Sequence, residues 1–127
     1  CGFVSQTAID KVLPYTDIFL YDIKAIDEDV HIKCTGQSNK QILENLKYID
    51  SQNKQIEIRI PFVPNCNCNQ INKIADFVKP LKNITNVKVL SYHNYAASKY
   101  EALNMQNTQP DTLPTDEQIQ NAQRLFN

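Results

Sequence analysis

The pattern of apolar and polar positions predicts three β-strands. Residues 18–24 form a short run rich in aromatic and branched side chains that becomes charged only at its end. Residues 55–63 alternate strictly, with isoleucines and a phenylalanine on one face and charged residues on the other. Residues 86–92 supply a third apolar segment. Each segment has the length and period of a strand that packs against a core.

Apolar residues at helical spacing surround these strands. The expected helices cover 5–13, a segment that starts after a cap at Ser38 or Asn39, the segment 71–78, and a C-terminal stretch in which Thr115 and Gln118 have capping-box spacing. An acidic turn is expected at 27–29, and most of the segment between the last strand and the last helix is expected to be irregular.

The order of these elements, with helices between successive strands, predicts βαβ units with right-handed crossovers and a parallel sheet. Three strands cannot close a barrel. The fold is therefore either a small open α/β sheet or the second half of a six-stranded partial barrel or of a related α/β barrel. The chain begins at Cys1-Gly2 without a methionine, and we expect it to be part of a longer gene product.

Composition narrows the class of protein. With 127 residues and 42% hydrophobic content, the chain can bury one modest core. Its 13 basic and 14 acidic residues give a net charge of -1, which provides no surplus for nucleic acid or an anionic membrane. No apolar run approaches the roughly 20 residues that span a bilayer, and no secretion signal is evident. We expect a cytoplasmic protein that binds neither nucleic acid nor membrane.

Polar side chains follow the ends of the predicted strands, where parallel α/β proteins bind ligands. Asp22 and Lys24 lie two residues apart on one face, Arg59 opposes the isoleucines of the second strand, and His93 ends the third. One acid and three potential cations suit a zwitterionic ligand with a carboxylate and an ammonium or sulfonium group. Each residue also has a structural interpretation: an ordinary ion pair for Asp22 and Lys24, packing or capping for Arg59, and a hydrogen-bonded histidine for His93.

The four cysteines match neither common zinc spacings nor a ferredoxin run. Cys66 and Cys68 could supply two metal ligands from one loop, but a single intervening residue is weak evidence for a metal. In a cytosolic protein we expect four reduced thiols without a structural bridge, these two together with Cys1 and Cys34.

Several motifs occur in a fixed order along the chain. They are LPYTD at 13–17, LYDIK at 20–24, HIKCTG at 31–36 with SN at 38–39, IRIPFVP at 58–64 and LSYHN at 90–94. In this order they resemble the pyruvate formate-lyase activating enzyme family, the glycyl radical enzyme activating enzymes of the radical S-adenosylmethionine (SAM) superfamily. The resemblance covers residues 1–103, with a looser match in the last helix.

The resemblance implies an α/β fold, namely the C-terminal half of a partial (β/α)6 TIM-like barrel in which three parallel strands alternate with helices. Residues 1–127 would then be the C-terminal portion of a radical SAM domain. An upstream CxxxCxxC loop would hold a 4Fe-4S cluster. Reductive cleavage of SAM would yield a 5'-deoxyadenosyl radical that forms a glycyl radical on pyruvate formate-lyase, with flavodoxin or ferredoxin as electron donor.

By the same resemblance, five residues of this chain belong to the SAM site. Asp22 and Lys24 would lie near the methionine carboxylate and a monovalent cation. Arg59 would match the arginine on the fifth strand of the family's barrel, and Leu90 with His93 would lie near the adenosine part of SAM. Catalytic residues and cluster ligands are expected outside this chain, which alone should be inactive.

The chain departs from the family pattern at several positions. Ser91 replaces a proline, Pro64-Asn65-Cys66 replaces a Pro-Gly turn, and Cys1 matches a strand-end residue better than a cluster ligand. Two alternatives stay open: an activating enzyme for a different glycyl radical enzyme, and a non-catalytic α/β binding module.

Overall fold

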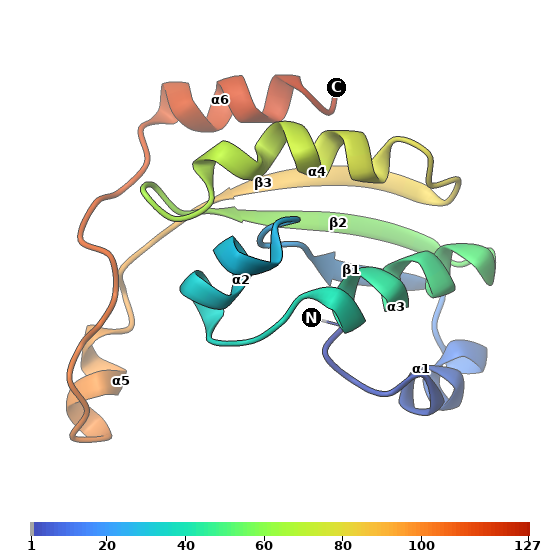
Figure 1. Ribbon diagram of the computed structural model, residues 1–127, viewed down its shortest axis with the longest axis horizontal. Coiled ribbons are helices and arrows are strands. Elements are labelled where there is room, and N and C mark those ends of the chain that lie inside the picture. The colour runs from blue at the N-terminus through green and yellow to red at the C-terminus, as the bar shows by residue number, and fades with distance from the viewer. Residues whose placement is uncertain (1) are drawn as a thin grey trace.

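Three parallel strands form the centre of the structure, a computed structural model that describes residues 2–127 (Figure 1). The strands are β1 (Ile18–Asp22), β2 (Gln55–Phe62) and β3 (Ile84–Ser91), and they lie side by side in the order β1-β2-β3. Asp22 pairs in register with Arg59, which pairs with Lys88. The parallel α/β architecture predicted from the sequence is confirmed.

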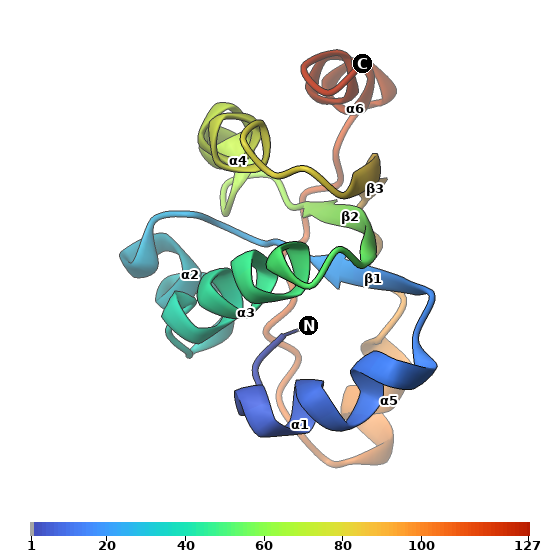
Figure 2. The ribbon, with the colours of Figure 1, turned by 90° about the vertical axis from the view of Figure 1, so that its right-hand side faces the viewer.

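Six α-helices accompany the sheet within the described residues. They are α1 (Gln6–Val12), α2 (Glu28–Thr35), α3 (Lys40–Ser51), α4 (Ile71–Val78), α5 (Ala97–Ala102) and α6 (Asp116–Arg124), with short 3-10 turns at Leu13–Tyr15 and Cys68–Gln70. Figure 2 shows α3 and α4 on one side of the sheet, with α6 beside α4. Within residues 2–127, no helix lies along the opposite face of the sheet, so strand side chains such as Leu20 and Leu90 are exposed there.

The core lies between the sheet and these helices. Alternation in β2 directs Ile56, Ile58 and Ile60 to the helical side, where each is fully buried. They pack in one cluster with Leu46 of α3 and Ile74 of α4. Burial of one such side chain stabilises the fold by about 2 kcal/mol. The same alternation sends the residues between the isoleucines to the open face.

The helix caps follow the sequence in part. The predicted capping box of α6 is present, since Thr115 and Gln118 exchange hydrogen bonds between side chain and backbone. Before α3, the hydroxyl of Ser38 accepts a hydrogen bond from the backbone N–H of Lys40. The side chain of Asn39 instead donates to the carbonyls of Ala25 and Ile26, which follow β1. Asn39 therefore ties α3 to the β1–α2 loop instead of capping the helix.

One prediction from the sequence was wrong about local structure. The acidic turn at 27–29 is the start of α2, which ends at Gly36 with a left-handed φ of 77°. The segment after β3 contains the short helix α5 and is otherwise irregular, which confirms the prediction that most of it lacks regular structure. The helix α2 buries only His31, so it produces no apolar stripe in the sequence.

The expectation of four reduced thiols was also wrong. Cys34, near the end of α2, is joined by a disulfide to Cys66 in the β2–α4 loop, with their Cα atoms 6.2 Å apart. The crossover topology brings these two residues together although they are 32 positions apart in the chain. Cys68 is a free, exposed thiol. The prediction for Cys1 lies outside the described residues.

None of the helices within residues 2–127 combines the length and the apolar character that crossing a membrane requires.

Candidate functional site

A row of charged side chains crosses the open face of the sheet near the carboxyl ends of the strands. Asp22 of β1 and Arg59 of β2 are register partners, and Nε of Arg59 lies 2.8 Å from Oδ1 of Asp22. Nη2 of Arg59 reaches the same oxygen at 2.8 Å. The Asp22 side chain is only 22% exposed, so this ion pair is partly shielded from water. The arrangement fixes the carboxylate and leaves its second oxygen, Oδ2, facing Lys24.

Lys24 follows β1 and places its ammonium beside this carboxylate. Its Nζ lies 4.0 Å from Oδ2 of Asp22, and 37% of its side chain is exposed. A cavity of about 180 Å³ is lined by Lys24 together with Cys34, Cys66 and Tyr92. The sequence prediction that Asp22, Lys24 and Arg59 lie together is therefore confirmed as geometry.

Leu90 and His93 occupy different positions relative to this cluster. Leu90 is in register with Pro61, two residues after Arg59, so it shares the open face of the sheet. His93 lies beyond the end of β3, where its exposed ring stacks on Tyr95 with centroids 5.0 Å apart. The structure thus brings Leu90 to the site's face and leaves His93 in the segment that follows the strand.

A second ion pair lies on the same face, nearer the amino end of β2. Glu57 of β2 contacts Nζ of Lys88 at 3.1 Å and accepts a hydrogen bond from Asn86. These bonds, led by the one from Lys88, lower the pKa of Glu57 below its ordinary value. The open face therefore carries two separate pairs of opposite charge, and Lys24 adds a cation to only one of them.

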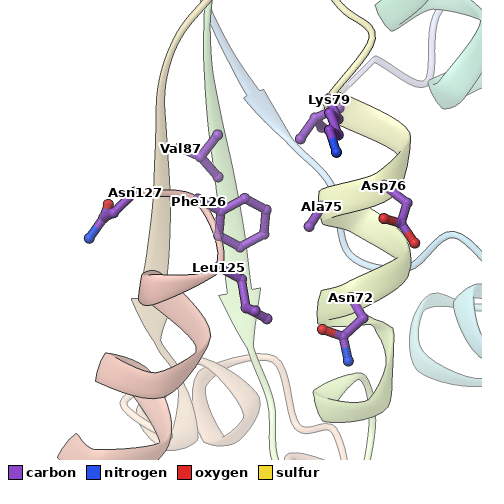
Figure 3. A pocket seen from close by; sticks show the side chains of 9 residues that line it. Asn72, Ala75, Asp76, Lys79, Val87, Leu125, Phe126 and Asn127 are labelled. Atoms are coloured by element: carbon purple, nitrogen blue, oxygen red, sulfur yellow. The ribbon is translucent and has the colours of Figure 1, made fainter.

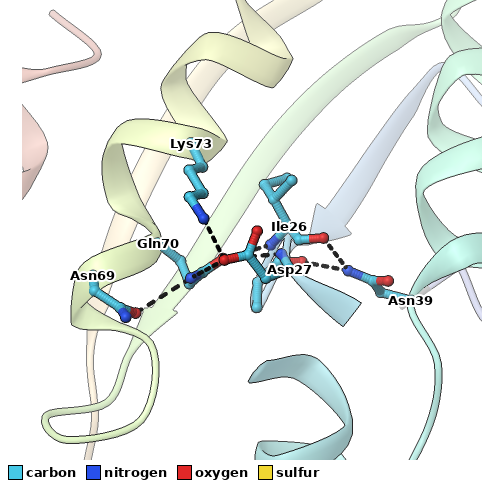
Figure 4. A network of polar contacts seen from close by, with 7 residues as sticks. Ile26, Asp27, Asn39, Asn69, Gln70 and Lys73 are labelled. Atoms are coloured by element: carbon cyan, nitrogen blue, oxygen red, sulfur yellow. Dashed lines mark hydrogen bonds and ion pairs between the residues drawn. The ribbon is translucent and has the colours of Figure 1, made fainter. Parts of the chain in front are cut away.

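The loop after β1 is held from behind by Gln70, a residue that the sequence did not single out. Its side-chain oxygen accepts from the backbone N–H groups of Ile26 and Asp27, and its nitrogen donates to the Asp27 carboxylate (Figure 4). Lys73 of α4 pairs with the same carboxylate. The hydrogen bonds from Lys73 and then Gln70 lower the pKa of Asp27. This network fixes the loop that carries Lys24.

His31 is a structural residue in this arrangement. It is buried, and its Nδ1 forms a 2.7 Å hydrogen bond with the backbone oxygen of Gln37. The bond ties α2 to the segment before α3. Within residues 2–127, no group of three or more His, Cys, Asp or Glu side chains gathers as metal ligands would.

Another cavity lies away from the strand ends. It has a volume of about 640 Å³ and is formed by α4, β3 and the end of α6, with Phe126 and Val87 on its floor and Asp76 and Lys79 at its edge (Figure 3). It belongs to the helical side of the sheet, so the charged row does not reach into it. We therefore place the candidate site on the open face.

No protein-family profile matches the chain. Curated relatives match it over most of its length. It is 38% identical to the trans-4-hydroxy-L-proline dehydratase activating enzyme of Clostridioides difficile, over 99% of this chain and 43% of that protein. It is 32% identical to the pyruvate formate-lyase-activating enzyme of Staphylococcus epidermidis, over 93% of this chain and 48% of that protein. The chain thus spans less than half the length of these two relatives.

A third relative is the (2S)-3-sulfopropanediol dehydratase activating enzyme of Klebsiella oxytoca, 33% identical over 98% of this chain and 42% of that protein. Among solved structures, the fold resembles a domain of a pyruvate-formate lyase-activating enzyme from Bacteroides vulgatus. The TM-score is 0.75 at 23% identity, over 95% of this chain and 68% of that chain. At this identity the structural likeness supports the fold alone.

Proposed function

Over nearly its whole length this chain is a homologue of glycyl radical enzyme activating enzymes, and from this premise we propose that it forms part of the SAM site of such an enzyme. The observation that carries the proposal is the Asp22–Arg59 pair with Lys24 beside it, at the carboxyl edge of a parallel sheet and on its open face. That edge is where α/β folds bind small ligands.

The chemistry of these side chains fits the amino-acid part of SAM. Arg59 occupies Oδ1 of Asp22, so Oδ2 is the oxygen free to accept a bond from a ligand or to face a monovalent cation. Lys24 offers a compact positive charge to a carboxylate. Leu90 would add an apolar contact on the same face, and His93 would approach from the segment after β3. When bound, SAM and a reduced 4Fe-4S cluster would supply the radical, with the cluster's ligands outside this chain.

The target of the enzyme is proposed only as a class. The names of the relatives refer to two dehydratases and to pyruvate formate-lyase, and these relatives have similar identities to this chain. We propose a glycyl radical enzyme as partner. Pyruvate formate-lyase as the target, flavodoxin or ferredoxin as the electron donor and the cytoplasm as the location stay predictions.

The test uses the full-length gene product, reconstituted anaerobically with iron and sulfide. After reduction and addition of SAM, the formation of 5'-deoxyadenosine is measured for the wild type and for Asp22→Ala and Lys24→Ala. Lys40→Ala is the matched control, because Lys40 pairs with Glu28 on the surface. We expect cleavage to fall sharply in the first two variants and to persist in the control.

Two outcomes would contradict the proposal. Equal cleavage in all variants would remove Asp22 and Lys24 from the SAM site. No cleavage by a protein with an intact, reduced cluster would argue against the activity itself and would favour a binding module.

A further inference from the structure

The ladder between β1 and β2 stops at a proline. The last backbone bond between these strands runs from the N–H of Ile23 to the carbonyl of Arg59. In a parallel ladder the next bond would run from the N–H of residue 61 to the carbonyl of Ile23. Residue 61 is Pro61, which has no N–H group. The backbone of Lys24 therefore lies beyond the last hydrogen bond between β1 and β2.

The side chain of Asn67 takes over where the ladder ends. Its amide nitrogen donates to the carbonyl of Lys24 and to the carbonyl of Pro61, each at 2.7 Å. Its amide oxygen accepts from the N–H of Val63 at 2.8 Å. One side chain thus bridges the segments that continue both strands.

Asn67 is itself held rigidly. It is only 2% exposed, and its own N–H donates to the carbonyl of Val63 within the β2–α4 loop. Asn65 allows this tight loop by adopting a left-handed φ of 61°. The neighbouring Cys66 is anchored to Cys34 by the disulfide. A buried amide with three short bonds has little freedom to move.

We propose that Asn67 is a positioning residue that sets where the Lys24 ammonium stands relative to Asp22. The inference rests on the proposed SAM site and adds to it a residue that acts through the backbone of Lys24. Without the bond from Asn67, the carbonyl of Lys24 lacks its strand-like anchor. Lys24 would then present its charge to a carboxylate from a range of positions, and ligands are held less tightly by groups that are not fixed in advance.

The experiment is a double-mutant cycle in SAM binding. Equilibrium dialysis of SAM against the reconstituted, unreduced full-length protein gives the dissociation constant for the wild type, Asn67→Ala, Lys24→Ala and the double variant. We expect Asn67→Ala to weaken binding about tenfold, a modest loss for a displaced positioning group. In the Lys24→Ala background the same change should have almost no effect, because the group that Asn67 positions is gone.

Two further variants separate positioning from general stability. Asn67→Asp keeps an acceptor for Val63 but loses both donor bonds, and it should weaken SAM binding as Asn67→Ala does. Asn83→Ala removes an amide that donates to the carbonyl and carboxylate of Asp50 at the opposite edge of the sheet. This control should lose stability without losing SAM affinity.

The outcomes distinguish the inference from the proposed function. If Lys24→Ala binds SAM as well as the wild type does, the assignment of Lys24 fails and the inference fails with it. If Lys24→Ala weakens binding but Asn67→Ala costs the same in both backgrounds, the SAM site stands and the positioning role is overturned. If neither Asn67 variant folds with its cluster, Asn67 is a structural residue only, and the inference is also overturned.

Discussion

Arg59 holds Asp22 by a single carboxylate oxygen, since Nε and Nη2 of its guanidinium both lie 2.8 Å from Oδ1. The two residues face each other in register on neighbouring strands, so backbone pairing sets the distance between their side chains. Arg59 therefore acts first on Asp22 and leaves Oδ2 for other partners. The sequence placed both residues at one sheet edge, but the division of the two oxygens emerges only from the structure.

The Asp22–Arg59 pair should contribute measurably to stability. We expect a coupling free energy of about 1 kcal/mol in a double-mutant cycle of Asp22→Ala and Arg59→Ala, the upper end of the range for partly exposed pairs. Urea unfolding of the four proteins gives this value. The same cycle on Glu57 and Lys88, the other ion pair on this face, gives a coupling free energy for comparison. Additive losses for Asp22 and Arg59 would show that their contact adds no stability.

Gln123 of α6 should stabilise the free edge of β3. Its side-chain oxygen accepts from the N–H of Val89 and its nitrogen donates to the carbonyl of Val87, both at 2.8 Å. Replacement by alanine leaves two backbone groups without these partners, and we expect a loss of about 1–3 kcal/mol in unfolding free energy. Gln120→Ala, an exposed change on the same helix, is the control. Equal stability of the two variants would contradict the prediction.

The disulfide should contribute more than any single hydrogen bond. In the chain-entropy description, closing a loop of this length raises the free energy of the unfolded state by about 3–4 kcal/mol. We expect Cys34→Ser or a reducing agent to lower the urea midpoint, while Cys68→Ser leaves it unchanged because that thiol is free and exposed. Peptide mapping without reductant should recover Cys34 and Cys66 in one linked fragment. Their recovery as separate fragments would argue against the bridge.

The sequence predicted those parts of the fold that repeat with a period. The isoleucines of β2 and the stripe of Ile42, Leu46 and Ile49 in α3 face one core, and periodicity reports such burial directly. By contrast, α2 buries only His31 and begins with Glu28 and Asp29. These acids suit a helix N-terminus as well as they suit a turn, so the acidic pattern alone did not decide between the two.

The candidate site was predictable only for residues that lie on the strands or directly after them. Because the carboxyl ends of parallel strands meet at one edge, the sequence alone predicts that Asp22 and Arg59 lie close together. Asn67 and Gln70 lie in a loop and a short turn, where neither period nor spacing indicates which distant backbone groups a side chain will reach. In the sequence, Pro61 near the end of β2 indicates only that one backbone hydrogen bond of the sheet is missing there, so that another group has to connect the strands.

The Asp27–Lys73 pair gives the last prediction, a loss of stability in acid. Because the hydrogen bonds from Lys73 and Gln70 lower the pKa of Asp27 in the folded state, the ionised carboxylate stabilises the fold above its ordinary pKa of about 4. That contribution is lost as the pH falls through the lowered folded-state pKa. Urea midpoints measured between about pH 5 and pH 2 should therefore fall less steeply for Asp27→Asn than for the wild type.

Asp29→Asn, at an exposed position in the same helix, should follow the wild-type slope. An unchanged slope for Asp27→Asn would mean that other carboxylates, such as Glu57 beside Lys88, govern the acid response.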